Sequence, residues 1–145
     1  MENNNKPYTR TKKADLSPLL YGKLPPQAPD LEGAVLGALM LEPAKLYVVF
    51  PIITTHDIFY SDANQRIYAS IRRLYDKGTM IDFMTVCEDL RKNSELEMVG
   101  GSYYVTSLTR DVVSSAHVEE HARIEVQKYI LRELIRIGGS VVGDA

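Results

Sequence analysis

The sequence predicts an all-α fold, a small helical bundle followed by a long C-terminal helix. Apolar residues recur at helical spacing through most of the chain, and no segment shows a convincing strand pattern. From about residue 115 to Val142 the helical pattern runs without a break. The chain has 145 residues, 45% of them apolar and 25% charged, as expected of one globular domain with a sizeable core.

The N-terminal region, 1–29, is predicted to be a disordered basic tail and a proline-rich arm. Residues 1–24 hold five basic and two acidic side chains and lack apolar periodicity. The stretch "LPPQAP" then favours an extended polyproline arm. The whole chain has a net charge of −2, without the basic footprint of a duplex-DNA binder. A nucleic-acid adaptor that uses only the tail remains an alternative.

The bundle is predicted to span 30–113 and to begin with a helix that Asp30 caps and that ends near Leu41. This helix is apolar on most sides, which is typical of a buried central helix. Gly33 and Gly37 each cost about 1 kcal/mol in a helix relative to alanine. We interpret them as helix-packing glycines, where another helix approaches closely. The uncharged run 33–41 is nine residues, short of the roughly 20 that a membrane span needs, so no membrane is expected as a partner.

Proline and small polar residues mark the next boundaries. Pro43 suits the first turn of a second helix, which Pro51 kinks or ends. The residues of the following connection that are predicted to enter the core are Ile58, Phe59 and Tyr60. A third helix is predicted from an N-cap at Ser61 to Lys77, with Gly78 just beyond its end.

A fourth helix is predicted to start at an Asp82 N-cap, with Ile81 and Val86 forming a hydrophobic staple. A short fifth helix, 102–109, follows the Gly100-Gly101 break. The apolar stripes of the third and fourth helices are predicted to be Ile67, Tyr68, Ile71, Leu74 and Tyr75, and Phe83, Val86, Cys87 and Leu90.

The sequence offers little catalytic chemistry. Cys87 is the one cysteine, which excludes an internal disulfide and favours a reducing cytoplasm; we interpret it as a core residue. The stretch His117 to His121 reads H-x-x-E-H, a helical zinc signature, so a small zinc hydrolase that uses this helix is an alternative. Catalytic zinc needs a third protein ligand, and no further histidine lies near. No phosphate-binding loop or dinucleotide fingerprint appears, so we predict no catalytic, metal or cofactor-binding residues.

The long helix, predicted over 114–145, carries the candidate interface. Its apolar side chains fill an arc of about 180°, whereas a surface helix needs only about 100°. They are Val126, Ile137, Ile130, Val141, Leu134, Leu131, Ile124, Val142 and Ile135. This breadth favours self-association or partner binding, with interface residues Ile124, Leu131, Leu134, Ile135, Val141 and Val142. Because the apolar phase continues through "GGSVVGDA", we expect more protein beyond this helix.

Five stretches in this order resemble the N-terminal domain of the DnaB-type bacterial replicative DNA helicase, and the resemblance covers about Leu24 to Val142. They are "LPPQAPDLEGAVLGALML", "DIFYSDANQRIYASI", "GTMIDFMTVCEDL", "LEMVGGSYYVTSLT" and "HARIEVQKYILRELI". The resemblance implies a small orthogonal helical bundle followed by the first arm of a helical dimerisation hairpin. The motor domain with its ATP site, and the second arm of the hairpin, are outside this sequence.

The resemblance also implies a function. The domain would be a non-catalytic scaffold that supports a hexameric collar in DNA replication, pairs with copies of itself, and docks primase and a helicase loader. DNA would be reached only through the parent hexamer, at the bacterial replication fork in the cytoplasm. ATP and Mg²⁺ are expected only in the motor domain of an ATP-dependent helicase, so this fragment itself is expected to be no enzyme. A generic helical adaptor remains a further alternative.

Overall fold

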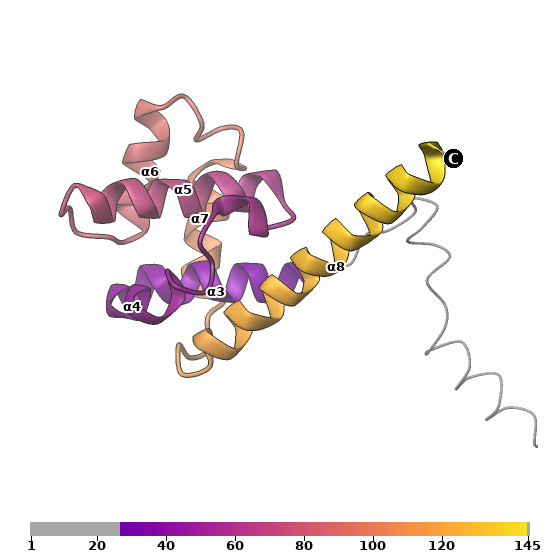
Figure 1. Ribbon diagram of the computed structural model, residues 1–145. Helices are drawn as coiled ribbons and strands as arrows, with labels where there is room; N and C mark the ends of the chain where they lie inside the picture. Colours follow the sequence, from indigo (N-terminus) through magenta and orange to yellow (C-terminus); the bar gives the residue numbers. More distant parts are fainter. Residues whose placement is uncertain (1–26, 145) are drawn as a thin grey trace, which may run out of the picture. The chain divides into compact units, whose positions relative to one another are not determined.

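The computed structural model describes residues 27–144, with side chains up to Gly139 (Figure 1). The regular secondary structure of these residues is helical, with no strand among them, and the all-α prediction is confirmed. Residues 27–129 form one compact unit, and the described residues from Ile130 onward belong to a second. The predicted basic tail and most of the proline-rich arm, 1–26, lie outside the described residues.

Helix α3, Pro29–Leu41, is the central helix of the bundle, and it packs against α5 and α7. Its core-facing residues are buried, as the continuous apolar pattern predicts. The prediction that Asp30 is the N-cap is wrong, because the cap is Ala28. Proline is favoured at the first helical position, so Pro29 starts the helix earlier. Asp30 then lies in the first turn, where a carboxylate interacts favourably with the helix dipole.

The end of α7 lies directly against Gly37. A Cβ added to Gly37 would clash with the carbonyl oxygen of Leu108 and the side chain of Val112, and would lie 2.9 Å from the carbonyl carbon of Leu108. A Cβ on Gly33 would lie 3.3 Å from a methyl group of Leu108. The absence of a side chain at position 37 therefore allows the backbones of α3 and α7 to approach closely.

The predicted second helix is divided into a 3-10 turn, Pro43–Lys45, and one turn of α-helix, α4, Leu46–Val49. It ends before Pro51, as predicted. A second 3-10 turn, His56–Ile58, leads to Phe59, and the side chains of Ile58 and Phe59 are buried. The prediction that Tyr60 also enters the core is wrong. Its ring is exposed, and its backbone N–H donates to a carboxylate oxygen of the buried Glu32.

Helices α5, Asp62–Asp76, and α6, Phe83–Lys92, begin at the predicted caps. Ser61 Oγ accepts from the backbone N–H of Asn64, and Gly78 has a left-handed φ of +70°. Asp82 and Thr85 form a reciprocal capping box, with 2.9 Å for each of its two hydrogen bonds. The predicted apolar stripes are buried except for two exposed rings at the helix ends, Tyr75 and Phe83.

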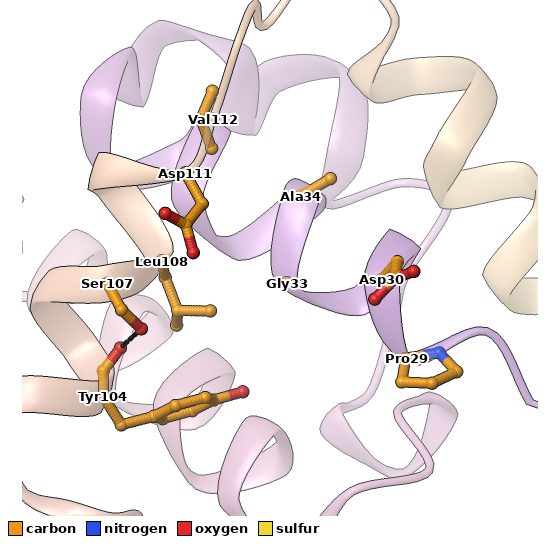
Figure 2. A pocket seen from close by; sticks show the side chains of 9 residues that line it. All are labelled: Pro29, Asp30, Gly33, Ala34, Tyr104, Ser107, Leu108, Asp111 and Val112. Atoms are coloured by element: carbon orange, nitrogen blue, oxygen red, sulfur yellow. Dashed lines mark hydrogen bonds between the residues drawn. The ribbon is translucent and has the colours of Figure 1, made fainter.

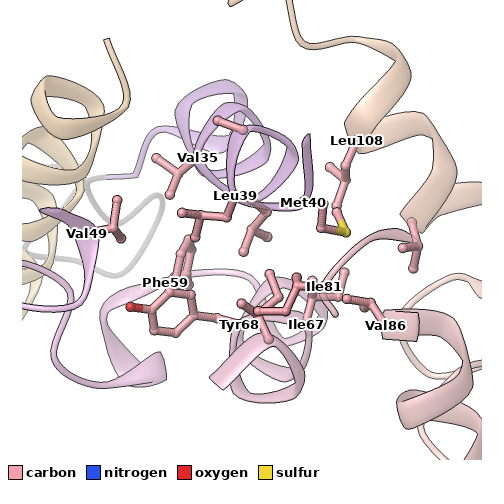
Figure 3. Packing of buried hydrophobic residues seen from close by; sticks show 14 of the residues in the cluster. Val35, Leu39, Met40, Val49, Phe59, Ile67, Tyr68, Ile81, Val86 and Leu108 are labelled. Atoms are coloured by element: carbon pink, nitrogen blue, oxygen red, sulfur yellow. The ribbon is translucent and has the colours of Figure 1, made fainter. Parts of the chain in front are cut away.

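Helix α7, Gly101–Arg110, has Gly100 as its N-cap, and both Gly100 and the first helical residue, Gly101, have positive φ. Helix α8 spans Val118–Asp144. The first turns of α8 bury Val118 and Ala122 in the bundle core. Figure 3 shows how side chains from the other elements meet in the bundle core. They are Val35, Leu39 and Met40 from α3, Ile67 and Tyr68 from α5, and Val86 from α6.

Candidate functional site

The second unit, from Ile130 onward, presents an apolar stripe along α8. The exposed fractions are 51% for Ile130, 60% for Leu134 and 49% for Ile137, residues that recur at the i, i+4, i+7 spacing of one helix face. Leu131, 36% exposed, flanks them. We call these four residues the α8 stripe.

The α8 stripe overlaps the predicted interface only in part. Leu131 and Leu134 belong to both sets, whereas Ile124 and Ile135 are half-buried. Val141 and Val142 lie beyond the last described side chain. The interface predicted from the sequence does not include Ile130 and Ile137, although both lie within the 180° arc of apolar side chains. Their place in that arc, on the same side as Leu134, was the signal for including them.

The chemistry of the α8 stripe is that of protein contact. Branched aliphatic side chains provide no acid, base or nucleophile. The adjacent charges form a local pair, in which the Arg136 guanidinium donates to Glu133 Oε1 at 2.8 and 3.2 Å. Such exposed pairs contribute little to stability, and they keep the polar side of a helix hydrated. Farther along, a Cβ on Gly138 or Gly139 would meet nothing within 4 Å.

The bundle unit has a groove of about 430 Å³ between the start of α3 and the end of α7 (Figure 2). Asp30, Gly33 and Ala34 line it from α3, and Tyr104 and Leu108 from α7. The Tyr104 hydroxyl donates to Asn64 Oδ1 at 2.6 Å, and burial raises the pKa of this tyrosine. Tyr104 is therefore a fixed, neutral donor in the bundle. Ser107 and Asp111 also line the groove, and the Ser107 hydroxyl donates to the carbonyl oxygen of Tyr104 at 2.6 Å.

Behind this groove, a buried carboxylate links three helices. Glu32 of α3 is 1% exposed and accepts from Asn64 Nδ2 at 2.8 Å and from the backbone N–H groups of Tyr60 and Ser61 at the start of α5. Asn64 in turn accepts from Tyr104 of α7. A buried carboxylate that accepts several hydrogen bonds has its desolvation cost offset, so this cluster fixes the geometry of the bundle.

The H-x-x-E-H stretch does not assemble a zinc site. His117 precedes the first residue of α8, and its Nδ1 lies 3.7 Å from Glu120 Oε1. The rings of His117 and His121 are 6.3 Å apart between centroids. Within residues 27–144, no three His, Cys, Asp or Glu side chains are grouped to hold a metal ion. The stretch therefore lacks the third ligand that catalytic zinc requires.

Cys87 lies in the bundle core, as predicted. It is buried on α6, and burial raises the pKa of its thiol. A protonated thiol is a poor nucleophile, so the position acts as a small apolar residue. No helix in the described part of the chain combines the length and apolarity of a membrane span.

Known proteins match this arrangement. Residues 24–127 match the family model described as DnaB-like helicase N terminal domain. The replicative DNA helicase DnaB of Rhodothermus marinus is 43% identical over 124 residues, covering 86% of this chain and 13% of the relative. The replicative DNA helicase DnaB of Geobacillus stearothermophilus is 39% identical over 129 residues, 89% of this chain and 28% of the relative. The chain therefore spans only a minor part of these relatives.

Two solved structures are also similar. The crystal structure of the N-terminal domain of DnaB helicase from Mycobacterium tuberculosis matches with a TM-score of 0.80 and 32% identity, covering 84% of this chain and 89% of that one. A DnaB-like replicative helicase, solved in a study of its interactions with primase, matches with a TM-score of 0.68 and 25% identity over 81% of this chain and 27% of that one. By its sequence match and its fold, the chain belongs to the family of DnaB-like helicase N-terminal domains.

Proposed function

We propose that this chain is the non-catalytic scaffold domain of a replicative DNA helicase and that it supports assembly of the helicase ring as a collar. ATP hydrolysis and DNA unwinding would belong to a separate motor domain, which binds ATP and Mg²⁺. Family membership supports this proposal, together with a surface suited to protein contact rather than chemistry.

The observation that carries the proposal is the α8 stripe. The stripe exposes Ile and Leu side chains to water at helical spacing. Covering them with another apolar surface would be favourable by about 25 cal/mol per Å² of apolar area removed from water. Helix-to-helix packing of such stripes is the usual way in which α-helical subunits pair. We assign the α8 stripe to pairing between copies of this domain, in which it forms the first arm of a hairpin interface.

Primase is the proposed partner of the assembled collar. The similar DnaB-like helicase whose study concerns interactions with primase supports this assignment. A helicase loader is proposed as a second partner on the strength of the family resemblance. Both would be met at the replication fork in the bacterial cytoplasm.

The test is the double substitution Leu134→Glu/Ile137→Glu, with light scattering behind a sizing column over a wide concentration range. Two carboxylates in the middle of the stripe should weaken self-association by roughly a hundredfold or more, because burying unpaired charges is costly. The helical circular dichroism spectrum and the melting curve of the bundle should stay unchanged.

The matched control is Tyr47→Glu, which places a carboxylate at an exposed apolar position of α4 in the bundle unit. It should leave association unchanged. Association that survives the double substitution, or that Tyr47→Glu weakens equally, would remove the α8 stripe from the interface.

A further inference from the structure

A polar pocket of about 280 Å³ lies on the bundle unit, between α5 and the connection before it, and it gathers cationic and hydroxyl groups. Its lining residues are Thr54, Thr55, His56, Tyr68, Ala69, Arg72 and Arg73. No acidic side chain lines it. This composition is unusual for the unit, because residues 27–129 contain five more acidic than basic side chains.

The core fixes the two walls of the pocket. The buried Tyr68 hydroxyl donates to the carbonyl oxygen of Ile53 at 2.6 Å, which ties the connection to α5 immediately before Thr54. On α5, the small side chain of Ala69 leaves room one turn before Arg72. The Arg72 guanidinium is held over the ring of Phe50, with Cζ 4.3 Å from the ring centroid. The pocket is therefore built on rigid elements.

The arginines of α5 differ in how their donors are used. Arg66 donates to Asp62 and Glu95 at 2.9 and 2.7 Å, and Arg73 donates twice to Asp89 Oδ2, at 3.0 and 2.6 Å. Arg72 makes no hydrogen bond with the described residues, and its contact with Asp76 Oδ1 is long, at 3.8 Å. Arg72 therefore presents a positioned planar guanidinium whose N–H groups can still bind a ligand.

The neighbouring groups are also donors. The Thr55 hydroxyl oxygen accepts from the backbone N–H of Asp57 at 3.3 Å, which leaves the hydroxyl hydrogen available. Thr54 offers a second, exposed hydroxyl, whereas the His56 ring already faces a carboxylate, with its Nε2 3.4 Å from Asp57 Oδ1. An oxyanion with several acceptor oxygens matches this set, and guanidinium groups bind phosphoryl oxygens in a bidentate manner.

We infer that this pocket is a binding site for a phosphoryl group, with Arg72 as its main ligand and the hydroxyls of Thr54 and Thr55 as further donors. The volume of about 280 Å³ leaves room for a phosphoryl group and for part of the molecule that carries it. Free phosphate and the backbone of single-stranded nucleic acid share this chemistry. The inference is independent of the α8 stripe, which lies in the other unit.

The test is titration of the 145-residue chain with inorganic phosphate at constant ionic strength, followed by amide chemical shifts in NMR spectra. The expected shifts are confined to 54–56 and 69–73. Arg72→Ala should weaken binding about tenfold, because it removes the charge-assisted hydrogen bonds. Asp76→Asn should strengthen binding about threefold, because it removes the carboxylate that competes for Arg72.

The matched control is Arg91→Ala, which removes another exposed arginine charge, on α6, where Arg91 pairs with Glu88. It should leave phosphate binding unchanged. A second titration with a short oligothymidylate distinguishes the sources. If the oligothymidylate binds more tightly than inorganic phosphate and its binding depends on Arg72, the site is assigned to the nucleic-acid backbone. If the oligothymidylate binds equally or more weakly, the site is assigned to free phosphate. Shifts spread over the whole surface, or equal losses in Arg72→Ala and Arg91→Ala, would overturn the inference.

Discussion

The two halves of α8 use the same residue types in different ways. In the bundle unit, Val118 and Ala122 are buried with the core, and Val126 and Tyr129 pack against it. In the second unit, Ile130 and Leu134 are about half exposed or more. An apolar residue in the first half therefore stabilises the fold, whereas one in the second half remains available to a partner. Mutations in the bundle unit should change stability, and mutations in the α8 stripe should change association.

Glycine-to-alanine substitutions should give the largest difference in stability effects between the two units. Gly37→Ala should lower the free energy of unfolding by about 3 kcal/mol, because the new methyl group meets the backbone of α7. Gly139→Ala should raise helix stability by up to about 1 kcal/mol, because the space around that residue is open. Urea unfolding of both variants measures the difference. Equal effects of the two substitutions would contradict the close approach of α3 and α7.

The next largest difference in stability is expected between removal of a buried carboxylate and removal of an exposed one. Glu32→Ala should lower the free energy of unfolding by about 2 kcal/mol, since it leaves the Asn64 amide and two backbone N–H groups without their acceptor. Glu32→Gln should recover part of this loss, because it retains one acceptor oxygen. Glu133→Ala, which removes an exposed pair with Arg136, should cost less than about 0.5 kcal/mol. Thermal melting of the three variants provides the comparison, and a Glu32→Ala variant as stable as Glu133→Ala would show that the cluster does not hold the bundle together.

Alkaline pH should affect the bundle unit. Burial raises the pKa of Tyr68 and of Tyr104 above the usual value of about 10. Above pH 10 the unfolded chain releases these protons while the folded chain retains them. The contribution of these two tyrosines to the free energy of unfolding is therefore complete below pH 10 and falls as pH rises, by up to about 1.4 kcal/mol per pH unit for each tyrosine. Urea unfolding at pH 8, 9, 10 and 11 measures the slope, which Tyr68→Phe should reduce; an unchanged free energy of unfolding up to pH 11 would contradict this prediction.

Local signals in the sequence predicted local structure well. The caps at Ser61 and Asp82 and the break at Gly78 depend on side chains within a few residues of the helix end, and each was found where predicted. The Asp30 cap was wrong because the neighbouring Pro29 is suited to the first helical position. Here two local preferences competed, and the sequence alone did not rank them.

Long-range contacts were the main limit. Glu32 looks like the polar flank of an apolar run, yet it is buried because its partners, 28–32 residues away, provide three donors. Tyr60 and Tyr75 fit apolar patterns and are exposed, since periodicity does not show where a helix meets its neighbour. The arc of the last helix indicated a wide apolar surface, but the exposure of Ile130 and Ile137 required the structure. The pocket around Arg72 was equally inaccessible, because it depends on which arginines of α5 already have partners.

The most direct measurement is sedimentation of residues 27–129 beside the full 145-residue chain over a wide concentration range. The shorter chain should unfold cooperatively and remain monomeric, because it contains the whole buried core and lacks the α8 stripe. The full chain should form dimers or larger species as its concentration rises. Equal association of the two chains, or a full chain that stays monomeric at every concentration, would contradict the assignment of association to the second half of α8.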